Sequence, residues 1–256
     1  FIHYKFTDAA INYIKTPREA PFFLYLAYTL PHKHVIAPTA KPYKDEKWPE
    51  PQKMLAAMIY RLDRDVGKIL NALDDQGLSE ETIVFFCSDN GPHNQEGIDP
   101  GFFRSSGPFR GIKRDLYEGG IRSPMIVRWK GKIKPGQTSD QVWAAWDVFP
   151  TLTELAGLKV PLGLDGESMV EPLLNGKIKK HAPLYWEFHE KGFHQAARMG
   201  DWKAVRHGVD ASLELYDLSI DPGETQDVSS SNRRMIKKIE SYLASARSDS
   251  REWPLP

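Results

Sequence analysis

The sequence has little cysteine, no excess of either charge and no long apolar run. Its single cysteine, Cys87, excludes an internal disulfide and any metal site built from several cysteines. The 34 Lys and Arg residues balance the 34 Asp and Glu residues, so no overall field attracts nucleic acid or an anionic membrane. No apolar stretch is long enough to span a bilayer. We therefore expect no nucleic-acid partner and no membrane span.

The composition is that of a globular protein. Hydrophobic residues make up 41% of the 256 residues and aromatic residues 11%, which is enough to bury a substantial core in one large domain or two modest ones. There are no internal repeats or low-complexity tracts. The chain opens at Phe1 without an initiator methionine or a signal-peptide core, so we expect a processed or truncated piece of a longer protein.

A buried strand that ends in polar residues is the most informative stretch. Residues 82–86 are an unbroken β-branched and aromatic run, typical of a strand covered on both faces, and Asp89 and Asn90 follow it closely. Ligands of open parallel sheets bind beyond the carboxyl ends of the strands, and carboxylate and amide oxygens suit Ca²⁺ or Mg²⁺. However, Asn90-Gly91-Pro92 is also a turn signature, and from this stretch alone the turn is the favoured interpretation.

A second buried run precedes this strand. Residues 22–28 predict a strand that ends before His32, and residues 53–76 show the apolar spacing of a helix that stops at Gly77. A further helix is expected over residues 7–15. Strand, helix and strand in this order predict a βαβ unit with parallel strands. The fold class that follows is α/β, with a mostly parallel central sheet flanked by helices.

The later part of the chain changes character. A long loop over residues 91–120 carries several cations and suits an anionic substrate, with a solvated surface as the alternative. A strand at 125–129 and a helix at 147–156, capped by Asp147, follow. Beyond residue 180, short strands with a hairpin turn at Gly200-Asp201 predict a small antiparallel sheet, and residues 232–246 predict a helix. We therefore divide the chain into residues 1–180 and a carboxyl-terminal subdomain, residues 181–256.

Several stretches together resemble one enzyme family. They are P-F-F-L-Y-L-A-Y-T-L-P-H, S-D-N-G-P-H, F-R-G-I-K-R-D-L-Y-E-G-G-I-R-S-P-M-I-V-R-W, D-V-F-P-T-L-T-E-L-A-G, L-D-G-E-S and L-Y-D-L-S-I-D-P-G-E-T-Q-D-V. In this order and rough spacing they look like the later half of a sulfatase of the arylsulfatase A type. The resemblance implies an alkaline-phosphatase-like α/β fold with a small carboxyl-terminal antiparallel sheet, and hydrolysis of aryl or carbohydrate sulfate monoesters.

The resemblance also implies roles for individual residues. Asp89 and Asn90 match the later pair of ligands for a divalent cation, usually Ca²⁺ and less often Mg²⁺. Lys113 matches the lysine that binds the sulfate oxygens, a task that suits a compact charge with three donors. His32 matches the histidine that protonates the leaving group, and a histidine can carry that proton near neutral pH.

Other residues receive weaker assignments. His93 and His34 either line the substrate pocket or are structural. Glu187, His189 and His194 lie in the predicted small sheet, where relatives shape the leaving-group pocket, so they are weak candidates for substrate binding. The family is usually exported, which implies a periplasmic or secreted location, although the chain shows no targeting segment.

The nucleophile of the family is missing. Its motif is a cysteine followed by x-Pro/Ala-x-Arg, which becomes formylglycine, whereas Cys87 is followed by Ser88-Asp89-Asn90-Gly91. We expect Cys87 to be a small buried hydrophobe at the end of its strand. An amino-terminal half outside this chain would supply the formylglycine, so the chain alone should be inactive. Two alternatives are a phosphodiesterase or phosphonate hydrolase of the same superfamily, and a noncatalytic remnant that binds sulfated glycans.

Overall fold

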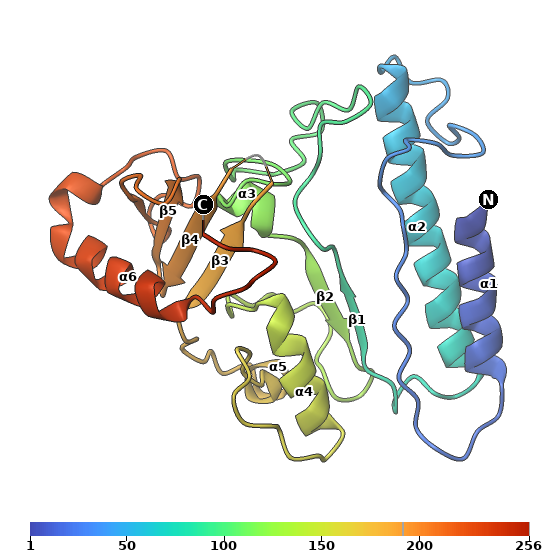
Figure 1. The fold of residues 1–256 in the computed structure, drawn as a ribbon. Coiled ribbons are helices and arrows are strands. Elements are labelled where there is room, and N and C mark those ends of the chain that lie inside the picture. Colours follow the sequence, from blue (N-terminus) through green and yellow to red (C-terminus); the bar gives the residue numbers. More distant parts are fainter. Residues whose placement is uncertain (191, 256) are drawn as a thin grey trace. The chain divides into compact units, whose positions relative to one another are not determined.

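The computed structural model describes residues 1–190 and 192–255 (Figure 1). The chain forms two compact units. The first unit comprises Phe1–Cys87, His93–Ser105 and Met125–Lys132. The second comprises Ser88–Pro92, Ser106–Pro124 and the chain from Ile133 onward. The predicted boundary at residue 180 stays a prediction, and the two units are described separately below.

Two helices form the core of the first unit. Helices α1 (Ile2–Lys15) and α2 (Glu50–Asp75) pack side by side, with Ile14 of α1 buried against Ala72 and Leu73 of α2 (Figure 1). Both predicted helices are confirmed, and each begins a few residues earlier than its apolar pattern. For α2 the reason is a proline in the first helical turn, where its missing N–H costs no hydrogen bond. Gly77 follows α2 with φ +69°, as expected for a helix stop.

The predicted βαβ unit is wrong in this chain. Strand β1 (Val84–Cys87) pairs antiparallel with β2 (Met125–Arg128), with Phe85 opposite Val127, and the described residues contain no parallel pair. Residues 22–28 alternate between half-buried and exposed side chains, as a strand does, but they have no ladder partner among the described strands. Phe22 and Leu24 pack instead on the α1 and α2 core. The apolar run at residues 22–28 therefore predicted the alternating burial of a strand. It did not predict the pairing, because pairing depends on a neighbouring strand that this run does not specify.

Cys87 also differs from its prediction. The structure places it at the exposed end of β1, so it is not a buried hydrophobe. The apolar run before it predicted burial, but burial on both faces requires elements that cover the strand.

Short helices open the second unit. They are α3 (Glu118–Ile121), the 3₁₀ turn η1 (Ala145–Asp147), α4 (Val148–Leu155) and α5 (Val170–Asn175). The predicted helix at 147–156 is confirmed, but Asp147 does not cap it through its side chain. Its carboxylate accepts the N–H groups of Ala144 (2.6 Å) and Glu167 (2.9 Å) and lies 2.9 Å from Nε2 of His181. Because these partners are distant in sequence or precede the helix, the local capping pattern did not reveal them.

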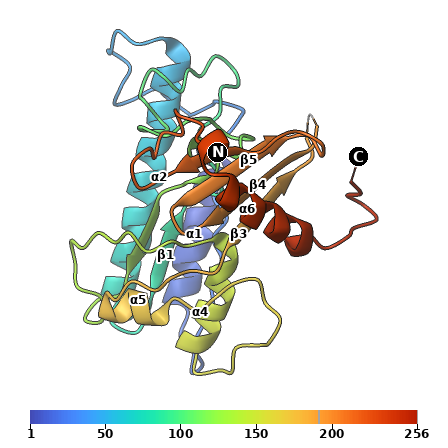
Figure 2. The same cartoon turned by 90° about the vertical axis from the view of Figure 1, so that its left-hand side faces the viewer.

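An antiparallel sheet and a helix complete the second unit. Strands β3 (Leu184–Phe188), β4 (His194–Met199), β5 (Trp202–His207) and β6 (Glu214–Asp217) pair in sequence order, and Gly200-Asp201 forms the predicted hairpin turn. Helix α6 (Arg233–Ala246) lies on this sheet (Figures 1 and 2). Their shared core contains Ala197, Ala204, Leu215, Ile239 and Leu243. The predicted sheet and terminal helix are therefore confirmed.

No helix among residues 1–190 and 192–255 combines the length and the apolar character needed to cross a membrane.

Candidate functional site

The turn after β1 is held by its backbone and its serines. The hydroxyl of Ser123 donates to the carbonyl of Ser88 (2.7 Å), and the N–H of Gly91 donates to the carbonyl of Gly120 (2.9 Å). Asp89 is exposed and Asn90 is half-buried. In the described part of the chain neither side chain makes a hydrogen bond. The Ser88 hydroxyl donates to the main-chain carbonyl of Asn90. The structure thus leaves the side-chain oxygens of Asp89 and Asn90 available to a ligand.

These oxygens fit part of a site for a hard cation. Ca²⁺ takes about six to eight oxygen ligands, and carboxylate and amide oxygens are among those it prefers. The described residues contain no group of three or more His, Cys, Asp and Glu residues arranged to hold a metal ion. Asp89 and Asn90 could therefore supply two of the ligands of such a cation.

The backbone brings Lys113 to the same turn. The N–H of Lys113 donates to the carbonyl of Pro92 (2.8 Å), two residues beyond Asn90. Gly111 before it has φ +87°, a conformation that residues with a Cβ rarely adopt. The N–H of Ile112 donates to Oδ2 of Asp115 (2.8 Å), which closes the loop. A half-buried lysine is thus held beside the Asp89 and Asn90 turn by main-chain hydrogen bonds.

Glycine makes this approach possible. A Cβ on Gly91 would lie 1.9 Å from the carbonyl oxygen of Gly119, and a Cβ on Gly119 would lie 2.4 Å from that of Gly111. On Gly120 it would lie 2.1 Å from the carbonyl oxygen of Asp115. The turn after β1, the lysine loop and α3 therefore touch through their main chains. The sequence analysis did not predict this contact.

A cluster of buried charged side chains also holds α3 in place. Nζ of Lys203 lies 2.9 Å from Oε1 of Glu118 and 3.4 Å from Oε1 of Glu224, and all three residues are buried. The N–H of Glu118 also donates to Oε2 of Glu224 (2.6 Å). Burial raises the pKa of Glu224, whereas at Glu118 the charge and hydrogen bond of Lys203 outweigh burial and lower the pKa. The sequence analysis missed this cluster, and the only local signal was a lysine flanked by Trp202 and Ala204 in β5.

His32 and His93 lie together in the first unit, with ring centroids 6.0 Å apart. His32 is exposed, and its Nδ1 donates to the carbonyl of Lys33 (2.7 Å). Nδ1 of His93 accepts the N–H of Gln95 (3.1 Å), which leaves Nε2 as the protonated nitrogen of the neutral ring.

His34 is anchored by a single carboxylate. Glu96 lies 2.7 Å from Nδ1 of His34 and accepts the N–H of Val35 (2.7 Å) through its other oxygen. The Val35 N–H and, after it, His34 lower the pKa of Glu96 against the opposing effect of burial. His34 itself remains exposed, so the structure gives it a structural partner on a surface loop.

Glu187 and His189 belong to a polar cluster at the end of β3. The Glu187 carboxylate accepts hydrogen bonds from the hydroxyl of Tyr185 and from Nε of Arg247 (3.0 Å), and it lies 2.9 Å from Nε2 of His189. Burial raises the pKa of Glu187, but these partners outweigh it and lower the pKa. Both residues thus have structural partners, and their assignment to substrate binding stays a prediction.

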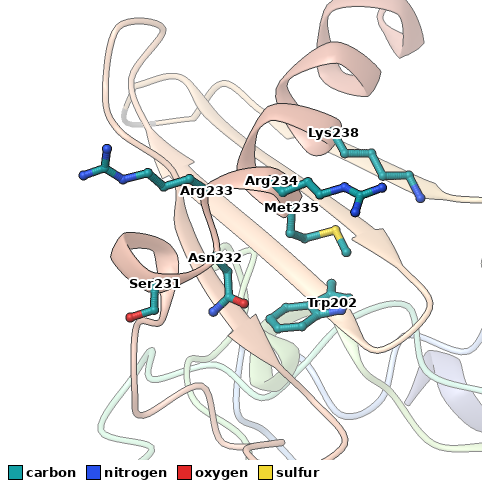
Figure 3. A pocket seen from close by; sticks show the side chains of 7 residues that line it. All are labelled: Trp202, Ser231, Asn232, Arg233, Arg234, Met235 and Lys238. Atoms are coloured by element: carbon teal, nitrogen blue, oxygen red, sulfur yellow. The ribbon is translucent and has the colours of Figure 1, made fainter.

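A basic hollow lies elsewhere in the second unit (Figure 3). Arg234 and Lys238 of α6 extend to the same side, near Trp202, whereas Arg233 points the other way. The lining residues are Trp202, Ser231, Asn232, Arg233, Arg234, Met235 and Lys238. None of the predicted site residues lines it, so it is distinct from the Asp89 and Lys113 turn.

Comparison with known proteins identifies the family. The sulfatase family pattern matches residues 4–158, and the carboxyl-terminal pattern of N-sulphoglucosamine sulphohydrolase matches residues 110–249. The chain belongs to the sulfatase family. It is 34% identical to the N-acetylgalactosamine-6-sulfatase of Mus musculus over 88% of this chain and 42% of that protein. It is 28% identical to the N-acetylgalactosamine-6-O-sulfatase of Bacteroides thetaiotaomicron over 94% of this chain and 50% of that protein.

Solved structures agree with this result. The crystal structure of Ps i-CgsB in complex with k-i-k-neocarrahexaose is 30% identical, with a TM-score of 0.83 over 94% of this chain and 55% of that chain. This likeness confirms the α/β fold class that the resemblance implies. The chain spans about half the length of the curated relatives it matches.

Proposed function

We propose that this chain provides the sulfate-binding lysine and part of the metal site of an enzyme that hydrolyses sulfate monoesters. The observation that carries the proposal is the main-chain contact between the Lys113 loop and the turn bearing Asp89 and Asn90. This contact supports the proposal because it holds the backbone of a lysine beside that of a carboxylate and an amide residue. A sulfate monoester is a tetrahedral monoanion, and positive charge beside its oxygens stabilises it.

Each of the proposed site residues has its own role. Lys113 binds the sulfate oxygens and stabilises the negative charge that grows on them as the ester bond breaks. Asp89 and Asn90 hold a divalent cation, which when bound supplies further positive charge at these oxygens. His32 donates a proton from Nε2 to the leaving oxygen, so that an alcohol rather than an alkoxide departs.

The nucleophile is proposed to lie outside residues 1–256. Cys87 lacks the family motif, so a formylglycine in an amino-terminal half of the same protein would attack sulfur. The chain alone is then inactive towards sulfate esters. Sulfated carbohydrates are the proposed substrates, because relatives carry the names of N-acetylgalactosamine-6-sulfatases, and the proposed location is periplasmic or secreted.

Anion binding by the chain tests this function directly. Lys113→Ala should weaken binding of inorganic sulfate by about 10- to 100-fold, the effect of losing a charged hydrogen bond. Lys237→Ala removes an exposed lysine of α6 and is the matched control. Calorimetric titration measures both. Equal sulfate affinity in wild type and Lys113→Ala would contradict the proposed function. Hydrolysis of a sulfate ester by the chain alone, if Lys113→Ala abolishes it, would contradict the proposed division between two halves.

A further inference from the structure

Two histidines face each other on neighbouring strands of the sheet in the second unit. His194 begins β4 and His207 ends β5, and the antiparallel register places them directly opposite each other. Their ring centroids lie 4.9 Å apart, and Nδ1 of His194 lies 2.8 Å from Nδ1 of His207. Because opposite residues share one face of a sheet, the register itself brings two imidazole nitrogens to one point.

A relay of hydrogen bonds fixes the proton of His207. The hydroxyl of Tyr117 donates its one proton to Oε2 of Glu214 (2.6 Å), so its oxygen accepts from Nε2 of His207 (2.9 Å). Nδ1 of the neutral His207 ring therefore has a lone pair, which accepts the Nδ1 proton of His194. Histidines that bind metals almost always donate their other ring N–H to a fixed partner in this way. His207 is thus oriented as a ligand through Nδ1.

The surroundings of the pair admit a cation. His194 is half-buried and His207 is exposed, so solvent reaches both residues. Asp115 adds a negative charge that acts on His194. The nearest relay cation, Arg110, lies 3.9 Å from the Glu214 carboxylate, which offsets its charge. The position between the two Nδ1 atoms is therefore accessible and has acidic groups near it.

We propose that His194 and His207 bind a divalent transition-metal ion through their two Nδ1 atoms. Imidazole nitrogens suit copper, nickel and zinc, whereas the oxygens of Asp89 and Asn90 suit Ca²⁺ or Mg²⁺. The described residues hold no cluster of three or more metal-binding side chains, so water completes the coordination. This site shares no residue with the proposed sulfate function and does not depend on it.

Metal binding moves one proton and leaves the charge of the rings unchanged. Nδ1 of His194 releases its proton to water, and Nε2 of the same ring takes one up. That Nε2 has no hydrogen-bond partner among the described residues and is not fully buried, so it can receive the proton. The His207 proton stays on Nε2, where Tyr117 holds it. Both Nδ1 lone pairs then point to the metal ion.

The spacing of the two nitrogens favours Cu²⁺. Two bonds of about 2.0 Å at a right angle separate their nitrogens by about 2.8 Å, whereas a tetrahedral angle separates them by about 3.3 Å. The two Nδ1 atoms are already 2.8 Å apart. The tetragonal geometry of Cu²⁺ therefore needs the least movement, and Cu²⁺ also binds most tightly among the first-row divalent ions.

Titration of copper chloride into the full chain, made without an affinity tag, tests the site by calorimetry. His194→Ala and His207→Ala should each weaken Cu²⁺ binding by about 100-fold, because each removes one of two ligands. Tyr117→Phe removes only the partner of His207 and should weaken it by about 10-fold. His34→Ala is the control, since this exposed histidine pairs with a glutamate and should leave the step unchanged.

The tautomers give a second measurement, which needs no variant. Long-range ¹H–¹⁵N correlation of the histidine-labelled chain should show Nδ1–H in His194 and Nε2–H in His207 without metal. Zn²⁺, which is diamagnetic, should move the His194 proton to Nε2, keep that of His207 in place and shift both Nδ1 resonances. Ca²⁺ should change neither ring.

The outcomes separate the metal site from its alternatives. Unchanged Cu²⁺ affinity in His194→Ala overturns the proposal, and so do Nδ1 resonances that do not respond to Zn²⁺. An equal response to Ca²⁺ overturns the assignment to a transition metal. Sulfate binding by Lys113 is measured separately, so failure of the metal site leaves the proposed function standing, and the reverse also holds.

Discussion

Two regions that carry candidate site residues are built very differently. The turn with Asp89 and Asn90 and the loop with Lys113 are joined by main-chain hydrogen bonds and close glycine contacts, and the adjacent α3 is fixed by a buried ion cluster. The segment with His32 and His34 is exposed, and Glu96 links it to a part of the first unit that is distant in sequence. The groups proposed to bind the sulfate and the divalent cation are thus preorganised, whereas the proposed proton donor lies on an exposed loop.

This difference has a physical explanation. Electrostatic stabilisation of an anion works best when charges and dipoles are already in place, because no reorganisation is then needed. A general acid must in addition exchange its proton with solvent after each turnover, and an exposed ring does so readily. We therefore expect mutations in the first region to act on folding and mutations in the second to act locally. The four predictions below test that contrast, beginning with the largest expected effect.

Gly119→Ala should prevent the second unit from folding correctly. Its Cβ would meet the carbonyl oxygens of Gly111 at 2.4 Å and Arg110 at 2.5 Å, and both are main-chain atoms that cannot move away cheaply. A loss of about 4 kcal/mol or more in the free energy of unfolding is expected. Gly67→Ala is the control, since nothing lies within 4 Å of its Cβ and alanine in α2 should stabilise by roughly 0.5–1 kcal/mol. Denaturant unfolding measures the stability of both variants. Equal stability of Gly119→Ala and Gly67→Ala would contradict the role of the close glycine contacts.

Lys203→Met should destabilise the second unit by about 3–5 kcal/mol, because it removes the buried cation that pairs with both Glu118 and Glu224. Glu118 keeps its ion pairs with Arg122 and Arg198. Lys237→Met on exposed α6 should change stability by less than about 0.5 kcal/mol. Urea unfolding at pH 7 compares the two variants. A Lys203→Met protein as stable as this control would contradict the role of the cluster.

The same variant should show an altered pH dependence. Without Lys203 the pKa of Glu224 should rise further, because burial already raises it in the wild type and the charge of Lys203 opposes that rise. A carboxyl with a raised folded pKa contributes stability below its unfolded pKa and loses it as the pH rises through the folded pKa. The deficit of Lys203→Met relative to wild type should therefore grow as the pH rises.

Ser123→Ala should have a smaller effect on the same region. It removes the hydrogen bond from the hydroxyl to the Ser88 carbonyl but none of the glycine contacts. A loss of about 0.5–1.5 kcal/mol in unfolding free energy is expected. Ser248→Ala is a suitable control, because that serine is exposed. A loss as large as that of Gly119→Ala would show that the turn depends on this one hydroxyl rather than on backbone packing.

Glu96→Gln should have the smallest effect, confined to the histidine loop. Global unfolding should stay unchanged, while hydrogen exchange of the Val35 amide becomes faster because its acceptor is weakened. In the wild type the lowered pKa of Glu96 means that its contribution is present above the unfolded pKa and is lost as the pH falls through the folded pKa. The protection factor of the Val35 amide, which is the exchange rate corrected for its intrinsic pH dependence, should accordingly fall in acid. A global loss of stability in Glu96→Gln would contradict the contrast between the two regions.

Much of the local structure could be predicted from the chain. The periodicity of residues 53–76 and 232–246 predicted α2 and α6, and Gly200-Asp201 predicted the β4 to β5 hairpin. The motif resemblance predicted the family. The errors concern neighbours: residues 22–28 lack a strand partner, β1 pairs antiparallel, and Cys87 is exposed. A hydrophobic run encodes a tendency to be covered, but it does not encode which element covers it.

The candidate site shows the same division. The sequence by itself determined which residue types are available: a carboxylate and an amide after β1, a lysine after the positive-φ Gly111, and histidines after the apolar runs. Only the tertiary structure decided that Lys203 is fully buried between Glu118 and Glu224 and that Nδ1 of His194 lies 2.8 Å from Nδ1 of His207. Charge burial and proton positions depend on groups up to about a hundred residues apart that share one space, and no local pattern specifies them.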